Sequence, residues 1–179
     1  GGAGVSVHGA FRVTSERTMF AMPETNIGLF PDVGATPFLS RLPGEVGTYL
    51  ALTGARLGAE DLLYCGLATH YVPSERLADL EAALQGCAGD AAVSDALTRL
   101  GGGSVVSGVA QKVAPLLAQN RQAIDACFSG ATVEEIEARL CGMGGEWAEG
   151  TLATLQKMSP TSCKVSRGAE IDQGSRGLA

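Results

Sequence analysis

The sequence predicts an α/β fold that is followed by a helical region. Over the first 90 residues, short β-branched and aromatic runs alternate with segments of helical periodicity. After residue 90 the chain shows amphipathic segments and no convincing strand. The 179 residues are 45% hydrophobic, which suffices for a buried core. We therefore expect an α/β part over 1–90, a helical region over 91–166 and an irregular tail over 167–179.

The first 54 residues contain a predicted helix start, two predicted strands and two further helical segments. GGAG has the small residues of a tight turn that leads into a helix. FRVTS and TMFAMP, residues 11–15 and 18–23, are predicted strands. DVGATPFLSRL is predicted to begin a helical turn at Asp32, and VGTYLALTG is predicted as a helix that ends at Gly54.

The alternation continues to residue 90. AEDLLYCG predicts a short helix and LATHYV, residues 67–72, predicts a strand. SERLADLEAALQG predicts a helix that is capped by Ser74. The glycine-rich stretch at 101–108 is the best candidate for a linker.

Several helix signals follow this stretch. Residues 109–128 carry apolar side chains at helical spacing, with Pro115 as a kink or a start. Thr132 and Glu135 form a capping-box pattern before the next helix. EWAEGTLATLQKM predicts a further helix, and Ser159 followed by proline predicts the start of another. The closing RGAEIDQGSRGLA is polar and glycine-rich without helical periodicity, so we expect it to be irregular.

Charge and cysteine content argue against several classes of protein. The net charge is −6 and the 13 basic residues are scattered, so we expect no direct nucleic-acid partner. The apolar runs end well before the roughly 20 residues of a membrane span, so we expect no membrane segment. The five cysteines form no CxxC motif and no Cys/His pair at ligand spacing. We predict that they are reduced, mostly packing thiols and not metal ligands.

Common cofactor and nucleophile motifs are missing from the sequence. It has no GxxxxGK[ST] loop, and GGAGVS does not match a GxGxxG after a strand, so nucleotide binding is not supported. No serine sits in GxSxG, which argues against a serine hydrolase. His8 and His70 lie in apolar contexts without a local acidic or Cys partner, and we expect both to be structural.

The segment AMPETNIGLFPDVG, residues 21–34, places two carboxylates, Glu24 and Asp32, in a loop that is otherwise apolar. Two carboxylates that face one apolar pocket would differ in proton affinity and could supply a nucleophile or base beside an acid. A structural interpretation stays open, in which Asp32 is the N-cap of the next helix and Glu24 is a solvated turn residue.

The opening pair Gly1 and Gly2 also allows two interpretations. Backbone N–H groups at a helix start can approach a substrate oxygen and stabilise the charge that develops there, as in an oxyanion hole. A glycine pair can equally form a plain turn.

Several segments taken together resemble one family. In chain order they are GGAGVSVHGAFRVTSERTMFAMPETNIGLFPDVG, LALTGARL, GLATHYVPSERL, CFSGATVEEIEARL and KMSPTS. They are similar to the 3-hydroxyisobutyryl-CoA hydrolase family of the crotonase superfamily, from residue 1 to about residue 166 and most weakly near 85–110. The resemblance implies a crotonase-like spiral of strand–strand–helix units, followed by a helical C-terminal region. Residues 1–90 would be the C-terminal half of that core.

The resemblance also implies roles for individual residues. Gly1, with Gly2 beside it, matches the glycine that holds the thioester carbonyl in the oxyanion hole, while Glu24 and Asp32 match the two acids. The implied reaction is attack on the thioester by Glu24, as nucleophile or as base for water, with Asp32 positioning or protonating. Related hydratases carry a glutamate where Gly4 stands, which favours hydrolysis, although an isomerase with a single base stays possible.

The resemblance further implies a mitochondrial enzyme of valine breakdown that acts on an acyl-CoA substrate. CoA is part of this substrate, and we expect no separate cofactor and no metal. The alternatives are an enoyl-CoA hydratase or isomerase and a structural subunit of a mitochondrial ribosome. The chain begins without Met and lacks the family's upstream half, so we expect an inactive fragment unless another chain, or a homo-oligomer, contributes the missing part.

Overall fold

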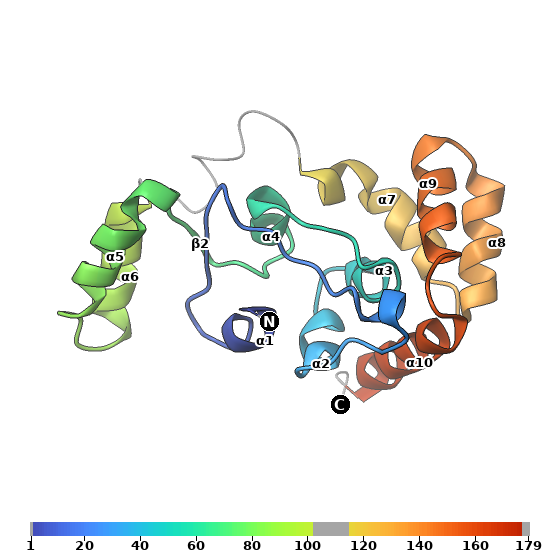
Figure 1. Ribbon diagram of the computed structural model, residues 1–179, viewed down its shortest axis with the longest axis horizontal. Helices are drawn as coiled ribbons and strands as arrows, with labels where there is room; N and C mark the ends of the chain where they lie inside the picture. The colour runs from blue at the N-terminus through green and yellow to red at the C-terminus, as the bar shows by residue number, and fades with distance from the viewer. Residues whose placement is uncertain (1, 102–114, 177–179) are drawn as a thin grey trace. The chain divides into compact units, whose positions relative to one another are not determined.

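The computed structural model describes residues 2–101 and 115–176, with residues 170–176 described by their backbone alone (Figure 1). The chain forms two compact units. The first comprises Gly1–Phe20 and Leu57–Gln119, and the second comprises Ala21–Arg56 and Asn120–Ala179. The two units interleave along the sequence, so their bounds differ from the expected divisions after residues 90 and 166.

The first unit contains a small parallel sheet and short helices (Figure 1). Strand β1 (Val13–Thr14) pairs with β2 (His70–Tyr71), with Val13 opposite His70. The strands predicted at 11–15 and 67–72 are therefore present but short. The helices of this unit are α1 (Gly2–Ser6), α4 (Ala59–Tyr64), η2 (Ser74–Arg76), α5 (Leu77–Leu84), α6 (Asp90–Leu100) and the start of α7 (Leu116–Phe128).

The strand predicted at 18–23 is wrong. Phe20 forms an isolated antiparallel bridge with Leu57, in which each N–H donates to the other's carbonyl, at 3.0 and 2.8 Å. Pro23 has no N–H to donate, and the chain enters a 3-10 helix at Glu24. The pairing therefore cannot extend beyond the bridge.

The prediction that Ser74 caps a helix is also wrong. Its hydroxyl donates to the Glu16 carboxylate, and its N–H donates to Glu16 Oε2 at 3.0 Å. The Tyr71 hydroxyl donates to the same oxygen at 3.3 Å. These hydrogen bonds, from Ser74 above all, hold the pKa of Glu16 at about 2. Glu16 thus ties the turn after β1 to the segment after β2.

A small apolar cluster supports α5 and α6. Its buried members are Val72, Leu80, Leu97 and Leu100. Phe11 packs against them, and its ring centroid lies 6.0 Å from that of His70. Burial lowers the pKa of His70. This packed environment agrees with the structural role predicted for this histidine.

Asp61 caps α7 from a different helix. Its side chain is buried on α4, and Oδ1 accepts the N–H of Leu117 at 2.8 Å. We expect Asp61→Ala to lower the free energy of unfolding by about 1–3 kcal/mol, because the buried N–H of Leu117 loses its acceptor. Urea denaturation measures this loss.

Asp61→Asn is the matched control for this change, since the amide oxygen can still accept the hydrogen bond. Burial raises the pKa of Asp61, so removing its charge should cost little. If Asn destabilised the protein as much as Ala, the capping role would be refuted.

Helix α3 (Val46–Thr53) is the centre of the second unit. All eight of its residues are buried, and it ends at Gly54 in a left-handed conformation, as predicted. Tyr49 packs edge-to-face on Phe128, with centroids 5.2 Å apart. The elements packed around α3 are η1 (Glu24–Ile27), α2 (Ala35–Leu39), α9 (Glu146–Leu155) and α10 (Pro160–Arg176), and α8 (Val133–Met143) packs on α9 and α10.

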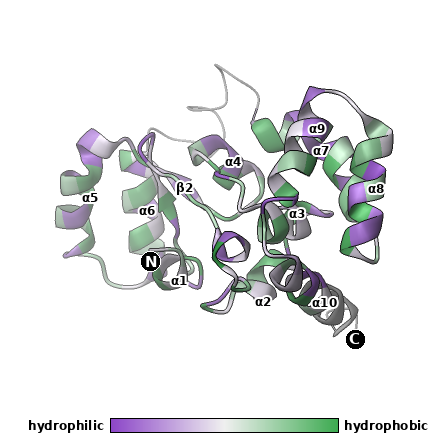
Figure 2. Ribbon diagram, turned by 45° about the vertical axis from the view of Figure 1, so that its right-hand side comes forward, coloured by the Kyte–Doolittle hydropathy of each residue, from purple (hydrophilic) through white to green (hydrophobic). Residues whose placement is uncertain are grey.

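Three predicted helix starts in the C-terminal region are confirmed. Helix α7 begins directly after Pro115, although residues 109–114 lie outside the described part of the chain. At α8, Thr132 Oγ1 accepts the N–H of Glu135 at 3.2 Å, while the Glu135 carboxylate accepts the N–H of Ala131. Helix α10 begins after Ser159. Figure 2 shows hydrophobic and hydrophilic residues interleaved along α8, as expected for an amphipathic helix.

The irregular tail predicted from residue 167 is wrong as far as Arg176, because α10 continues to that residue. The buried side of α10 carries Ser162, Cys163, Ser166 and Arg167. Three of these side chains are polar and the fourth is a small thiol. The sequence therefore shows no hydrophobic periodicity, although the helix packs on α3.

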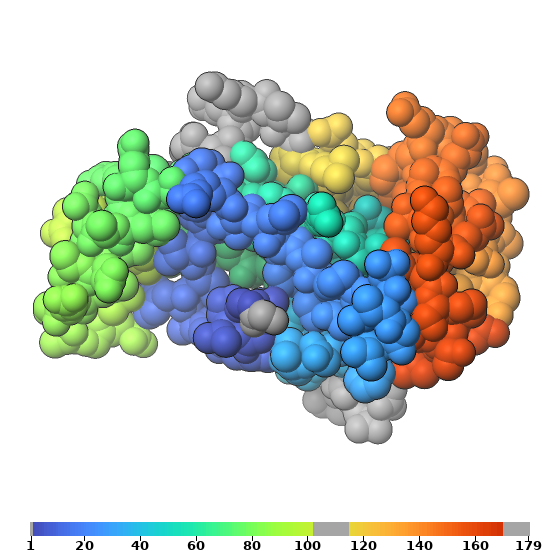
Figure 3. Space-filling model, in the orientation of Figure 1, coloured from blue at the N-terminus to red at the C-terminus, as the bar shows by residue number. Residues whose placement is uncertain are grey.

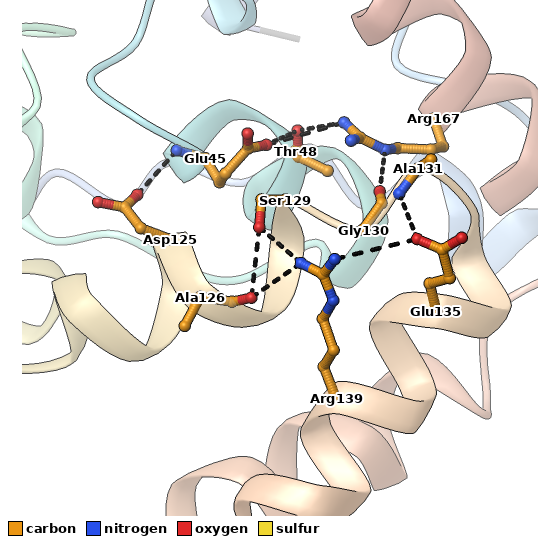
Figure 4. A network of polar contacts seen from close by, with 10 residues as sticks. All are labelled: Glu45, Thr48, Asp125, Ala126, Ser129, Gly130, Ala131, Glu135, Arg139 and Arg167. Carbon is orange, nitrogen blue, oxygen red and sulfur yellow. Dashed lines mark hydrogen bonds and ion pairs between the residues drawn. The ribbon is translucent and has the colours of Figure 1, made fainter.

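Arg167 fastens α10 to the rest of the second unit (Figure 4). Its Nε donates to the carbonyl of Gly130 at 2.9 Å, and its Nη1 donates to Thr48 Oγ1 at 3.1 Å. Nη1 also lies 3.7 Å from Glu45 Oε2. One guanidinium thus joins α10 to α3 and to the turn between α7 and α8.

The same network continues to α7 (Figure 4). The N–H of Glu45 donates to Asp125 Oδ1 at 2.9 Å, and Arg121 pairs with the same carboxylate at 2.8 Å. This close approach requires glycine at position 44, because a Cβ there would collide with the Asp125 carboxylate.

All five cysteines are free thiols, as predicted, and Cys65, Cys127 and Cys163 are buried. Within the described ranges, no helix is both long and apolar enough to cross a membrane. Most of the linker predicted at 101–108 lies outside those ranges.

Candidate active site

Glu24 opens η1 and is half-buried. Its Oε2 is buried and has no hydrogen-bond partner among the described residues. Burial raises the pKa of Glu24, and the negative charge of Asp32 raises this pKa further. A carboxylate with a raised pKa and an oxygen free of protein partners can accept a proton or attack an electrophile.

The 3-10 helix that carries Glu24 is anchored on both sides. Thr25 is fully buried and its hydroxyl donates to the carbonyl of Leu52 in α3 at 3.3 Å. The carbonyl of Thr25 accepts the N–H of Ser159, just before α10, at 2.9 Å. Figure 3 shows the blue segment around η1 at the surface, beside the orange-red C-terminal helices. The backbone of Glu24 is therefore held by α3 and by the start of α10.

Asp32 lies in a turn before α2 and its side chain is exposed. The N-cap of α2 is Gly34, which makes no side-chain cap hydrogen bond, so the interpretation of Asp32 as N-cap is wrong. Asp32 instead accepts the N–H of Ala35 through its main-chain carbonyl, at 2.8 Å. The carboxylate is left available to other groups.

The two acids therefore occupy different environments. Glu24 has the partly buried setting expected for both, whereas Asp32 is exposed. They are nevertheless close enough for the charge of Asp32 to act on Glu24. A difference in burial between two neighbouring carboxylates separates their proton affinities, so that one can act as a base or nucleophile and the other as an acid.

The segment between the acids exposes large apolar side chains that sequence reasoning did not single out. They are Ile27, Leu29 and Phe30, with exposed fractions of 69, 51 and 52%. Val33, directly after Asp32, is 45% exposed. A run of exposed apolar residues beside two acids is unusual on a water-facing surface. The apolar run IGLF, residues 27–30, between turn-forming residues was the sequence feature that could have predicted this exposed apolar segment.

The glycines predicted for the oxyanion hole belong to the first unit. Gly1 lies outside the described residues, and Gly2 is the exposed first residue of α1. The first N–H groups of a helix have no partner within that helix. Over the described parts of the chain, no group of three or more His, Cys, Asp or Glu side chains could hold a metal ion.

A sequence profile of the enoyl-CoA hydratase/isomerase family matches residues 1–176. The chain belongs to the enoyl-CoA hydratase/isomerase family. Within this family, the mitochondrial 3-hydroxyisobutyryl-CoA hydrolase of Xenopus laevis is 49% identical over 168 residues, which are 93% of this chain and 43% of that protein. 3-Hydroxyisobutyryl-CoA hydrolase 1 of Arabidopsis thaliana is 49% identical over 175 residues, covering 93% of this chain and 44% of the relative.

Two solved structures of family members share the fold. A carnitinyl-CoA dehydratase from Mycobacterium thermoresistibile has a TM-score of 0.85 and 33% identity, over 97% of this chain and 48% of that one. An enoyl-CoA hydratase from Rhodobacter sphaeroides has a TM-score of 0.78 and 32% identity, over 96% of this chain and 46% of that one. The expected crotonase-like α/β fold is thus confirmed. The chain spans about half the length of the curated relatives that it matches.

Proposed function

We propose that the protein is an acyl-CoA thioester hydrolase that converts 3-hydroxyisobutyryl-CoA into 3-hydroxyisobutyrate and CoA. Relatives at 45 to 49% identity bear the name of this hydrolase, and several are named as mitochondrial. We therefore also propose a mitochondrial location and a role in valine catabolism. CoA enters as part of the substrate, and no separate cofactor is required for this chemistry.

The observation that carries the proposal is the buried oxygen of Glu24 without a hydrogen-bond partner, next to a second acid. Glu24 would attack the thioester carbonyl itself, expelling the CoA thiolate and forming an anhydride that water then hydrolyses. Alternatively, it would take a proton from a water molecule that attacks the carbonyl directly. Asp32 would position that water or supply a proton to the leaving group. Both routes release the free acid and the thiol of CoA.

Gly1, with Gly2 beside it, is proposed to stabilise the negative charge on the thioester oxygen through one backbone N–H group. A complete oxyanion hole needs a second donor, and we propose that a segment beyond these 179 residues, or another chain, provides it. Activity is therefore best measured on the complete native protein.

The test is release of free thiol from 3-hydroxyisobutyryl-CoA by the complete native protein. We expect thiol to appear in step with 3-hydroxyisobutyrate and to depend on protein concentration. Absence of thiol release, under conditions in which the substrate is bound, would contradict the proposal.

A hydratase is the second candidate, because both solved relatives carry names of that reaction type. Addition of water to an enoyl-CoA removes the conjugated double bond and leaves the thioester intact. Loss of enoyl absorbance without free thiol would identify this activity and distinguish it from hydrolysis.

A further inference from the structure

Val33 has a backbone conformation that valine seldom adopts. Its φ is 49°, and within residues 2–101 and 115–176 no other non-glycine residue has a positive φ. Positive φ is costly for any side chain with a Cβ and most costly for a β-branched one. The burial of Val33 does not explain the choice, because its side chain is 45% exposed.

The conformation belongs to a tight turn. The carbonyl of Asp32 accepts the N–H of Ala35 at 2.8 Å, and Gly34, the second central residue, has a φ of 74°. Positive φ at both central positions is the pattern of a type I′ turn, for which Asn-Gly is the favoured pair. Valine therefore stands where asparagine would fit without strain.

The turn is held at both ends. Pro31 is buried before it and restricts the backbone that leads into Asp32. Ala35 is fully buried after it, at the start of α2, which packs on α3 and α10. A strained conformation persists when its surroundings determine it in this way, and such positions cluster at active sites.

We propose that Val33 is a positioning residue, whose enforced left-handed turn directs the carboxylate of Asp32 toward Glu24. The proposal rests on the proposed function for its kinetic consequences. It assigns the effect to the backbone of the turn and not to the valine side chain. The influence of Asp32 on the pKa of Glu24 agrees with this arrangement.

Two substitutions at this position separate backbone from side chain. Val33→Asn suits the left-handed turn, so we expect the melting temperature of the full chain to rise by about 2–4 °C and kcat to stay within about twofold. Val33→Pro forbids a positive φ, so we expect kcat to fall at least about tenfold with little change in KM. Val165→Asn is the matched control, since this valine of α10 is 49% exposed and does not have a positive φ. It should not raise the melting temperature.

A second readout needs no substrate. NMR titration should show the pKa of Glu24 unchanged in Val33→Asn and lower in Val33→Pro. If the proline variant does not fold, Gly34→Ala tests the same turn with a smaller perturbation, and kcat should fall several-fold.

The outcomes distinguish this inference from the proposed function. Loss of kcat in Val33→Asn, full kcat in the variants that disfavour the turn, or no gain in melting temperature over Val165→Asn would each overturn the inference. Absence of hydrolysis in the unmodified protein would refute the proposed function alone, because the melting and titration results would still test the turn.

Discussion

Replacing Glu24 by glutamine should reduce thiol release from 3-hydroxyisobutyryl-CoA by about 10²- to 10⁴-fold, the range expected for loss of a general base. Glutamine keeps the size of the side chain and one oxygen that can accept a hydrogen bond. It removes the negative charge, and with it the ability to attack the carbonyl or to take a proton from water. The measurement is kcat of the complete native protein, followed by free-thiol detection.

Glu75→Gln is the matched control. Glu75 also lies in the first turn of a 3-10 helix shortly after a proline, but it is exposed. Its replacement should leave the rate unchanged. Equal rates for the unmodified protein and Glu24→Gln would refute the role of Glu24.

The same substitution should stabilise the fold at neutral pH. Because burial raises the pKa of Glu24 above its ordinary value of 4.5, the folded state binds the proton more tightly than the unfolded chain. Stability therefore falls as the pH rises from 4.5 through the raised pKa. Glu24→Gln lacks this penalty, so its melting temperature should exceed that of the unmodified protein at pH 7, with the difference closing below pH 4.5.

Replacing Arg167 by methionine should lower the free energy of unfolding by about 3 kcal/mol. The guanidinium is nearly buried, and its removal leaves the carbonyl of Gly130 without a donor (Figure 4). It also leaves the carboxylate of Glu45 without its paired cation, so that, among the described residues, only the hydroxyl of Thr48 still donates to Glu45 Oε2. Methionine fills a similar volume, so the loss reports mainly on the polar contacts. Urea denaturation of the 179-residue chain gives the value.

Arg139→Met is the control for this change. Arg139 contacts the neighbouring part of the same turn, through the carbonyl of Ala126 and the hydroxyl of Ser129, but its side chain is 43% exposed. Its replacement should cost less than about 1 kcal/mol. An equal decrease in the free energy of unfolding for Arg167→Met and Arg139→Met would refute the prediction that the buried contacts of Arg167 stabilise α10.

Local sequence signals correctly predicted helix ends and caps where the hydrogen bonds that form them join neighbouring residues. Gly54 ends α3, and Thr132 caps α8, because the relevant hydrogen bonds are made within a few residues. The same signals failed where a distant partner competes. Ser74 resembles a cap, yet its hydroxyl is used by Glu16, which lies far away in the sequence.

Some features of the candidate site could likewise be predicted from the sequence, and others could not. The spacing of Glu24 and Asp32 between prolines and glycines was visible in the sequence, as was their match to two acids of a known family. Their unequal environments were not, because the 3-10 helix that carries Glu24 is held through Thr25 by α3 and by the start of α10, which are distant in the sequence. Nor did the sequence reveal that Val33 is held at a positive φ, since nothing in the letters DVG excludes an ordinary turn.

The sequence by itself determined the family and the order of most helices, and it predicted Glu24 and Asp32 as the candidate acids, because these depend on residue types at short or matched spacings. Only the tertiary structure decided which acid is enclosed, how far α10 extends and how the turn at Val33 is held. These features depend on contacts between residues that are distant in the sequence, and local sequence patterns do not predict such contacts.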